Sequence, residues 1–340
     1  MIMAKELEVT GYLEHCKLAQ ELNGIIWYRI LLAWSFLACF FATYAQSSFI
    51  LNKILRLRFQ GNMTFLLFAY FTTSALFSLV STGGFGWRNA ASLFSTNCDL
   101  LIDREIFIWY HLSSLVMMTM QMLIPLGFSI ERIVAFNNAG HYEHRRTKLG
   151  PLIFLLLTVV DGLIIYGVFH TEKFTGPFVS LILVPSSTAL YFNIYYIALL
   201  LIQIFNMVII IVLMRLMKQK PRNNVLSLRY EIEEFKDASD FIFHISSYHI
   251  FFAGCYVFFG LLARYCGPLL FEKVVHYTAA RATFCSIPTY NLIIVIIGMG
   301  KLKKMEEGKK KRVLKEISMS AVGKSGMANY NKIYRQLWEV

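Results

Sequence analysis

Charged residues are scarce in this sequence. Asp, Glu, Lys and Arg together make up 16% of its 340 residues, whereas a soluble domain contains about 25%. Hydrophobic residues make up 56%, so the composition indicates an integral membrane protein in contact with lipid. The net charge of +12 does not indicate a nucleic-acid partner, because the basic residues lie between apolar runs and in the C-terminal tail.

The motifs of several enzyme classes are also absent. An intramembrane aspartyl protease needs two buried carboxylates, and Asp161 is the only carboxylate deep inside an apolar run. The HExxH motif of metalloproteases and the GxSxG motif of serine hydrolases do not occur. The six cysteines form no CxxC pair, and His141 and His144 have no other ligand type beside them. We therefore expect no enzyme activity, no metal site and no cofactor.

Seven long apolar runs dominate the sequence. A helix needs about 20 apolar residues to cross the ~30 Å hydrocarbon core of a bilayer. Only helices and closed barrels satisfy every backbone polar group in lipid, and these runs lack the alternation typical of strands. We therefore predict an all-α membrane protein, a seven-transmembrane helix bundle. The runs are Ile26–Leu51, Met63–Val80, Ile106–Ile130, Pro151–Phe169, Ala189–Met217, Phe241–Ala263 and Val274–Met299.

The distribution of Lys and Arg predicts the orientation of this bundle. Cytoplasmic loops of membrane proteins carry an excess of these residues. Here most of the 33 Lys and Arg residues lie in alternate connections and in the C-terminal tail. We therefore expect the N-terminus outside and the C-terminus in the cytoplasm. The glycosylation sequon at Asn62 falls in the first inner loop, so we expect it to be unused. The basic segments are 52–62, 132–150, 215–240 and 299–340.

Three regions follow from this topology. We expect an extracellular N-terminal tail over 1–25, a transmembrane domain over 26–299 and a basic cytoplasmic tail over 300–340. Lys/Arg clusters beside a membrane are attracted to anionic lipids. The expected location is therefore the plasma membrane, as a multi-pass protein.

The third run ends abruptly in Glu131 and Arg132. Charges at this depth are costly unless they pair or reach water, and they often mark function. We interpret the pair as a candidate switch. The alternative is an interfacial pair that only fixes the depth of the helix.

Three cysteines lie on the predicted outer side. The second outer loop, 171–188, contains no cysteine, so the bridge from helix three to this loop that many seven-helix receptors have cannot form. Cys98 instead has two candidate partners in an oxidising compartment, Cys16 and Cys266. The sequence does not choose between them.

Several polar and aromatic residues lie toward the outer side of the runs. Arg281 interrupts the seventh run, where it must face water, a carboxylate or a ligand. With its neighbours it is a candidate for an aromatic, polarisable ligand pocket between helices. The alternative for each residue is ordinary packing within the bundle. The candidates are His111, Met118, Tyr195, Tyr256, Arg281 and Phe284.

The seventh run contains the tetrapeptide Pro288-Thr289-Tyr290-Asn291. A proline inside a helix removes a backbone hydrogen bond and produces a kink. A kinked helix beside a charged inner end is a suitable bistable element. We therefore add Pro288, Tyr290 and Asn291 to the candidate switch, although the proline has the alternative role of fixing the shape of the helix.

Four segments of the sequence resemble landmarks of the nematode serpentine chemoreceptors of the alpha and beta group, with class alpha as the expected class. Those receptors are rhodopsin-like seven-transmembrane proteins. The segments are Ser227-Leu228-Arg229-Tyr230-Glu231-Ile232-Glu233-Glu234, Cys98-Asp99-Leu100, Glu131-Arg132-Ile133-Val134-Ala135 and Pro288-Thr289-Tyr290-Asn291.

The resemblance implies a G-protein-coupled chemosensory receptor in the cilia of chemosensory neurons. It implies a small chemical ligand that binds from the outer side and a heterotrimeric G protein whose Gα subunit meets Arg132 once this residue leaves Glu131. The alternative function is a seven-span ligand-gated channel or transporter. The sequence argues against that alternative, since it shows no polar stripe typical of a filter and no internal repeat.

Overall fold

The chain forms a bundle of long helices. The computed structural model describes residues 2–56, 61–94, 97–138, 148–185, 187–219, 226–283, 286–320 and 327. Within these ranges the only β pairing is a bridge between Ile102 and Phe178. The helices are α1 (Ile2–Gly24), α2 (Ile26–Asn52), η1 (Ile54–Arg56), α3 (Gly61–Phe94), η2 (Asn97–Leu100), α4 (Arg104–Asn137), α5 (Leu149–Phe169), α6 (Ala189–Gln219), α7 (Leu226–Tyr265), α8 (Gly267–Leu270), α9 (Val274–Thr283) and α10 (Ile287–Ser320).

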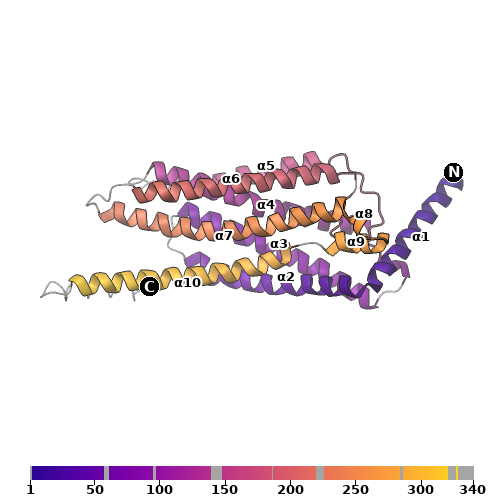
Figure 1. Ribbon diagram of the computed structural model, residues 1–340, viewed down its shortest axis with the longest axis horizontal. Helices are drawn as coiled ribbons and strands as arrows, with labels where there is room; N and C mark the ends of the chain where they lie inside the picture. The colour runs from indigo at the N-terminus through magenta and orange to yellow at the C-terminus, as the bar shows by residue number, and fades with distance from the viewer. Residues whose placement is uncertain are drawn as a thin grey trace. The chain divides into compact units, whose positions relative to one another are not determined.

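The chain divides into two units. The first, Met1–Ile296, holds α1 to α9 and the start of α10. Within it, helices α2 to α7 pack side by side, with α4 in contact with α3, α5, α6 and α7 (Figure 1). The second unit, Ile297–Val340, contains the rest of α10. The site described below lies in the first unit.

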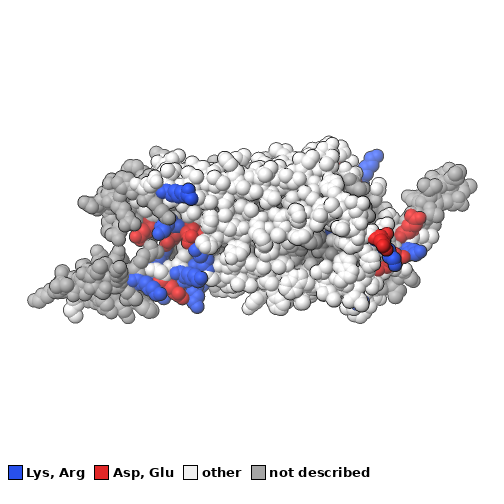
Figure 2. Space-filling model, in the orientation of Figure 1, with Lys and Arg blue, Asp and Glu red and all other residues white. Residues whose placement is uncertain are grey.

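Among the described residues, six helices, α2 to α7, are long and apolar enough to cross a membrane. Their outward faces are apolar: Leu155, Phe205 and Phe251 are each more than 60% exposed. The face shown in Figure 2 carries no charged side chain along its middle. So large an exposed apolar surface is expected where side chains contact lipid instead of water. The predicted all-α multi-pass architecture and the first six runs are confirmed.

The seventh run is not the single helix that we predicted. Helix α9 ends at Thr283, and α10 begins at Ile287. Pro288 is therefore the second residue of a helix, where its missing N–H is not needed for a helical hydrogen bond. The expected kink at Pro288 is wrong, because the proline lies in the first turn of α10 and not in the interior of a helix. Arg281 lies in the separate helix α9.

A disulfide joins Cys16 of α1 to Cys98 of η2, and Cys266 is free. Residues 16–24 are thus part of a packed helix and not of a loose tail. Asn23 Nδ2 also donates to the backbone oxygen of Ser92 at 3.0 Å, and Leu22 is buried in a cluster with residues of α2 and α3. We call this end of the bundle the disulfide end, and the opposite end, which α4 reaches at Arg132, the Arg132 end.

The 171–188 segment is fixed to the disulfide end without a cysteine. Ile102 N donates to Phe178 O at 2.8 Å, and Phe178 N donates back at 3.3 Å. Arg88 of α3 is buried and donates to the carbonyl oxygens of Leu100 and Val179, the latter at 3.0 Å. These contacts hold the segment against α3 and α4.

Candidate functional site

Two adjoining cavities lie at the disulfide end, with volumes of about 60 and 50 Å³. The first is bounded by the 171–188 segment, α6, α7 and α9, and the second by the same segment, α3, α4, α6 and α7. Both cavities are lined by Ile182, Val184, Phe192 and Tyr256. The two cavities are therefore neighbours that share part of their walls. A small-molecule site between helices of a bundle is the usual arrangement.

Four of the six predicted ligand residues line these cavities. His111 and Met118 line the second cavity, Arg281 lines the first, and Tyr256 lines both. Tyr195 lines neither, because its hydroxyl donates to Asp161 Oδ1 on α5 at 3.2 Å. Phe284 lies outside the described residues.

His111 is held in an aromatic stack below the 171–188 segment. Its ring stacks on Phe107 with centroids 5.1 Å apart, and Phe107 stacks on Phe178 at 3.8 Å. Phe169 of α5 packs edge-on against His111 at 5.8 Å. The stack connects His111, in the wall of the second cavity, to Phe178 of the 171–188 segment.

Arg264 is a site residue that the sequence reasoning missed. It is the arginine in the last turn of α7, and it lines the first cavity together with Arg281. Arg264 Nη1 donates to the backbone oxygen of Ala189 at 3.0 Å and to Asn193 Oδ1 at 3.4 Å. Because Arg264 directly follows an apolar run, its position in the sequence suggested only a loop residue.

A buried polar network crosses the middle of the bundle. Asn291 of α10 accepts from Ser74 Oγ at 2.9 Å and donates to Ser78 Oγ at 3.2 Å. Gln46 of α2 donates to Ser74 Oγ at 2.7 Å and to the backbone oxygen of Asn291 at 2.8 Å. All four side chains are buried. The network joins α2 and α3 to the first turns of α10.

Tyr290 makes a second connection from α10. Its hydroxyl is hydrogen-bonded to the hydroxyl of Tyr70 on α3 and to His249 Nδ1 on α7, the latter at 2.9 Å. The ring of Tyr70 also packs against Phe128 of α4 at 6.0 Å. Tyr290 and Asn291 therefore belong to the centre of the bundle, whereas Glu131 and Arg132 lie at one end of it.

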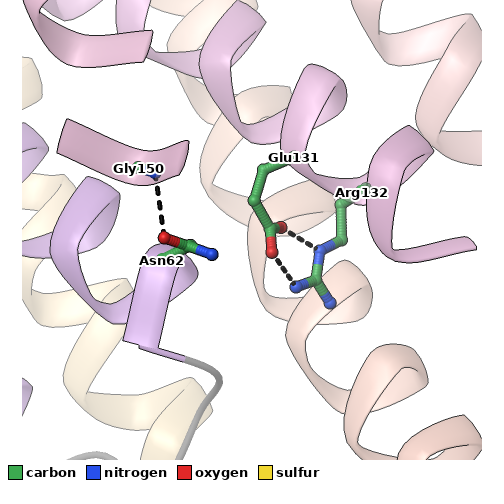
Figure 3. Close-up of polar contacts among 4 residues, drawn as sticks. All are labelled: Asn62, Glu131, Arg132 and Gly150. Atoms are coloured by element: carbon green, nitrogen blue, oxygen red, sulfur yellow. Dashed lines mark hydrogen bonds and ion pairs between the residues drawn. The ribbon is translucent and has the colours of Figure 1, made fainter. Parts of the chain in front are cut away.

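Glu131 and Arg132 form a buried ion pair at the Arg132 end. Arg132 Nε donates to Glu131 Oε2 at 2.6 Å, and Nη2 donates to Oε1 at 2.9 Å (Figure 3). The two side chains are 0% and 2% exposed. Two parallel hydrogen bonds between a guanidinium and a carboxylate are among the strongest polar contacts in proteins. The pair is therefore a defined, closed arrangement.

The same arginine also contacts α7. Its guanidinium carbon lies 5.0 Å from the ring centroid of Phe235. Phe235 is buried in an apolar cluster with Ala135 of α4 and with Leu213 and Met217 of α6. A movement of α7 away from α4 would thus remove a cation–π contact and open this cluster.

A further contact near the pair joins α3 to α5. Asn62 Oδ1 accepts a hydrogen bond from Gly150 N at 3.0 Å, at the start of α5 (Figure 3). A Cβ atom on Gly150 would lie 2.7 Å from the backbone oxygen of Asn62. The two helix starts are therefore in close contact, and Asn62 is only 9% exposed.

Comparison with known proteins identifies the family of this chain. Residues 25–253 match the family described as "Serpentine type 7TM GPCR chemoreceptor Srb". The chain belongs to this family. It is similar to serpentine receptor class beta-3 of Caenorhabditis elegans, with 40% identity over 95% of this chain and 96% of the relative. It is also similar to class beta-12, at 35% identity, and class beta-2, at 36%, from the same organism, over at least 96% of each chain.

Membership in the Srb family confirms the predicted resemblance and corrects one detail. The chain falls in class beta, whereas the resemblance suggested class alpha. The family also confirms a chemoreceptor and a multi-pass protein of the plasma membrane. The matched range ends within α7, and the class beta relatives extend the similarity through α9 and α10.

Proposed function

We propose that this Srb receptor binds a small chemical ligand at the disulfide end and activates a heterotrimeric G protein at the Arg132 end. The disulfide end then faces the outside, where Cys16 and Cys98 meet an oxidising environment. The Arg132 end faces the cytoplasm, which agrees with the Lys and Arg residues of the inner loops.

The observation that carries this proposal is the buried ion pair of Glu131 and Arg132 against Phe235. A buried ion pair is weak evidence for stability, because the desolvation of two charges offsets most of their attraction. Its use is better explained by a switch that holds one arrangement of α4 and α7. When the pair opens, the Arg132 side chain becomes available to the Gα subunit.

Helices α4 and α7 each contribute residues both to the cavities and to the contacts at the Arg132 end. Helix α4 supplies His111 and Met118 to the second cavity and Arg132 to the pair, while α7 supplies Tyr256 to both cavities and Phe235 to the cation–π contact. A ligand that binds more tightly to the open arrangement shifts the population toward it. Tyr290 and Asn291 lie between these ends and connect α10 to α3 and α7.

The proposal is tested by substitutions at the pair, in cells that express the receptor and a G-protein dissociation sensor. Arg132→Ala is expected to abolish ligand-evoked activation at equal surface expression. Glu131→Gln is expected to raise basal activity, because it removes the charge that retains Arg132. Arg29→Ala is the control, since Arg29 is an exposed arginine in the first turn of α2, far from the Arg132 end.

Two results would contradict the proposal. Activation that persists in Arg132→Ala would exclude the assigned role of this residue. A ligand-evoked membrane current in cells without G protein would favour a channel or transporter, so current is recorded in the same experiment.

A further inference from the structure

The charged residues that line the first cavity are all positive. The residues that line the two cavities include two arginines, Arg264 and Arg281, and no Asp or Glu. Both arginines line the first cavity, Arg264 from α7 and Arg281 from α9. In the described part of the chain, neither has a carboxylate within ion-pair distance. Two half-buried cations without a counter-ion form an unfavourable arrangement that a bound anion relieves.

The remaining polar contacts of these arginines are with neutral groups. Arg264 donates to the oxygen atoms of Ala189 and Asn193. Arg281 Nη1 donates to the Tyr277 hydroxyl at 3.5 Å, and its guanidinium carbon lies 5.4 Å from the centroid of that ring. These contacts orient the side chains but leave their charge uncompensated. A planar guanidinium is well suited to bind a carboxylate, sulfate or phosphate through two hydrogen bonds.

A third donor lies in the same cavity. Asn193 Nδ2 is buried and has no hydrogen-bond partner within the described structure. A buried donor without a partner carries a free-energy cost. A ligand that presents an acceptor oxygen between Arg264, Arg281 and Asn193 would remove this cost by accepting a hydrogen bond from Asn193 Nδ2. This observation is independent of the charges and indicates the same ligand chemistry.

The second cavity has a different character. Its lining is largely apolar, and it shares Phe192 and Tyr256 with the first cavity. Ser81 and Ser114 are polar members of its wall, and their buried hydroxyls have no partner among the described residues. The apolar members are Phe77, Phe85, Leu115, Met118, Leu181, Ile182, Val184 and Phe192.

We propose that the ligand of this receptor is a small organic anion with a short apolar chain. Its carboxylate, sulfate or phosphate group binds between Arg264 and Arg281, and its chain lies in the second cavity between α3, α4 and the 171–188 segment. The inference rests on the proposed role of these cavities as the ligand site. It adds to that proposal the negative charge of the ligand and its orientation, with the anionic group in the first cavity and the apolar chain in the second.

Binding is measured without any G protein, so that this inference and the proposed signalling role are tested separately. The full-length receptor is placed in phosphatidylcholine nanodiscs, and its apparent Tm is titrated with six-carbon probes. Hexanoate, hexyl sulfate and hexyl phosphate carry the anion, whereas hexanol is neutral and hexylammonium is a cation. At least one anionic probe is expected to raise the Tm saturably, at concentrations where hexanol and hexylammonium do not.

Variants locate the anion. Arg264→Gln and Arg281→Gln are each expected to weaken anion binding about tenfold or more, as for loss of a charged hydrogen-bond partner. Lys273→Gln is the matched control, because it removes an exposed positive charge next to α9 that does not line either cavity. Arg264→Lys and Arg281→Lys keep the charge and are expected to retain part of the binding if a glutamine variant does not fold.

The outcomes are distinct. The inference is wrong if none of the anionic probes binds, if hexanol or hexylammonium stabilises the receptor equally, or if both glutamine variants bind the anion as the wild type does. Anion binding that depends on both arginines supports it, even if Arg132→Ala later shows that signalling proceeds by another route.

Discussion

Arg132 of α4 and Phe235 of α7 are in contact at the Arg132 end of the bundle, with the guanidinium carbon 5.0 Å from the ring centroid. The arginine is at the same time bonded to Glu131 of its own helix. In the proposed switch, this one side chain takes part in both changes, the opening of the ion pair and the separation of α4 from α7.

We predict that Phe235→Leu raises basal G-protein activity while surface expression stays near the wild-type level. Leucine fills most of the apolar cluster but cannot make the cation–π contact, which contributes about 0.5–2 kcal/mol. The measurement is basal dissociation of the G protein per receptor at the cell surface. Phe205→Leu is the control, since Phe205 is 67% exposed on α6. Equal basal activity in both variants would show that the contact does not restrain α7.

We predict that Tyr290→Phe lowers the apparent Tm and leaves both Tyr70 and His249 without their shared partner. A hydrogen bond contributes about 1 kcal/mol, and an unpaired buried group costs more. Since Tyr70 and Tyr290 share one hydrogen bond, the losses in Tyr70→Phe and Tyr290→Phe should not be additive. A double-mutant cycle measured by thermal unfolding in nanodiscs tests this. Fully additive losses would contradict the described link between α3 and α10.

We predict that Cys16→Ser and Cys98→Ser each destabilise the receptor by about 2–4 kcal/mol, the usual contribution of a disulfide. The double variant should be no less stable than either single one, because each removes the same bond. Cys266→Ser is the control, since Cys266 is a free thiol. Thermal unfolding under non-reducing conditions gives the result, and a large loss in Cys266→Ser would indicate a different pairing.

We predict that Arg88→Gln weakens ligand binding without preventing surface expression. The buried guanidinium donates to two carbonyl oxygens, one of them in the 171–188 segment that lines both cavities. Faster hydrogen exchange around Val179, together with lower affinity, is the expected signature. Arg104→Gln removes a more exposed arginine, which bonds Phe174 O at 3.1 Å, and should have the smaller effect. The reverse order would show that Arg88 does not hold the segment.

We predict that Asn62 carries no glycan when the receptor is expressed in animal cells. Its side chain is buried and bonded to Gly150 N, and the proposed topology places it on the cytoplasmic side. Treatment with an N-glycosidase should leave the electrophoretic mobility unchanged. A shift that Asn62→Gln abolishes would place the Arg132 end outside the cell and reverse the proposed orientation.

The sequence alone predicted the helical architecture, because in lipid the length of an apolar run and the absence of alternation leave one solution. It located Glu131 and Arg132 because charges at the end of such a run are conspicuous. It also reduced the partners of Cys98 to two. These are local properties, each readable within one segment or from the side of the membrane on which a residue lies.

Only the tertiary structure decided which distant residues meet. It joined Cys98 to Cys16 and placed Phe235 against Arg132. It brought Arg264 and Arg281 into one cavity, although the first follows the sixth run and the second lies in a separate short helix. It also moved Tyr195 from the expected pocket to a bond with Asp161. Such pairings depend on how each helix is rotated about its axis and on which helices are neighbours. Those choices result from packing and hydrogen bonding over the whole bundle, and no single apolar run contains them.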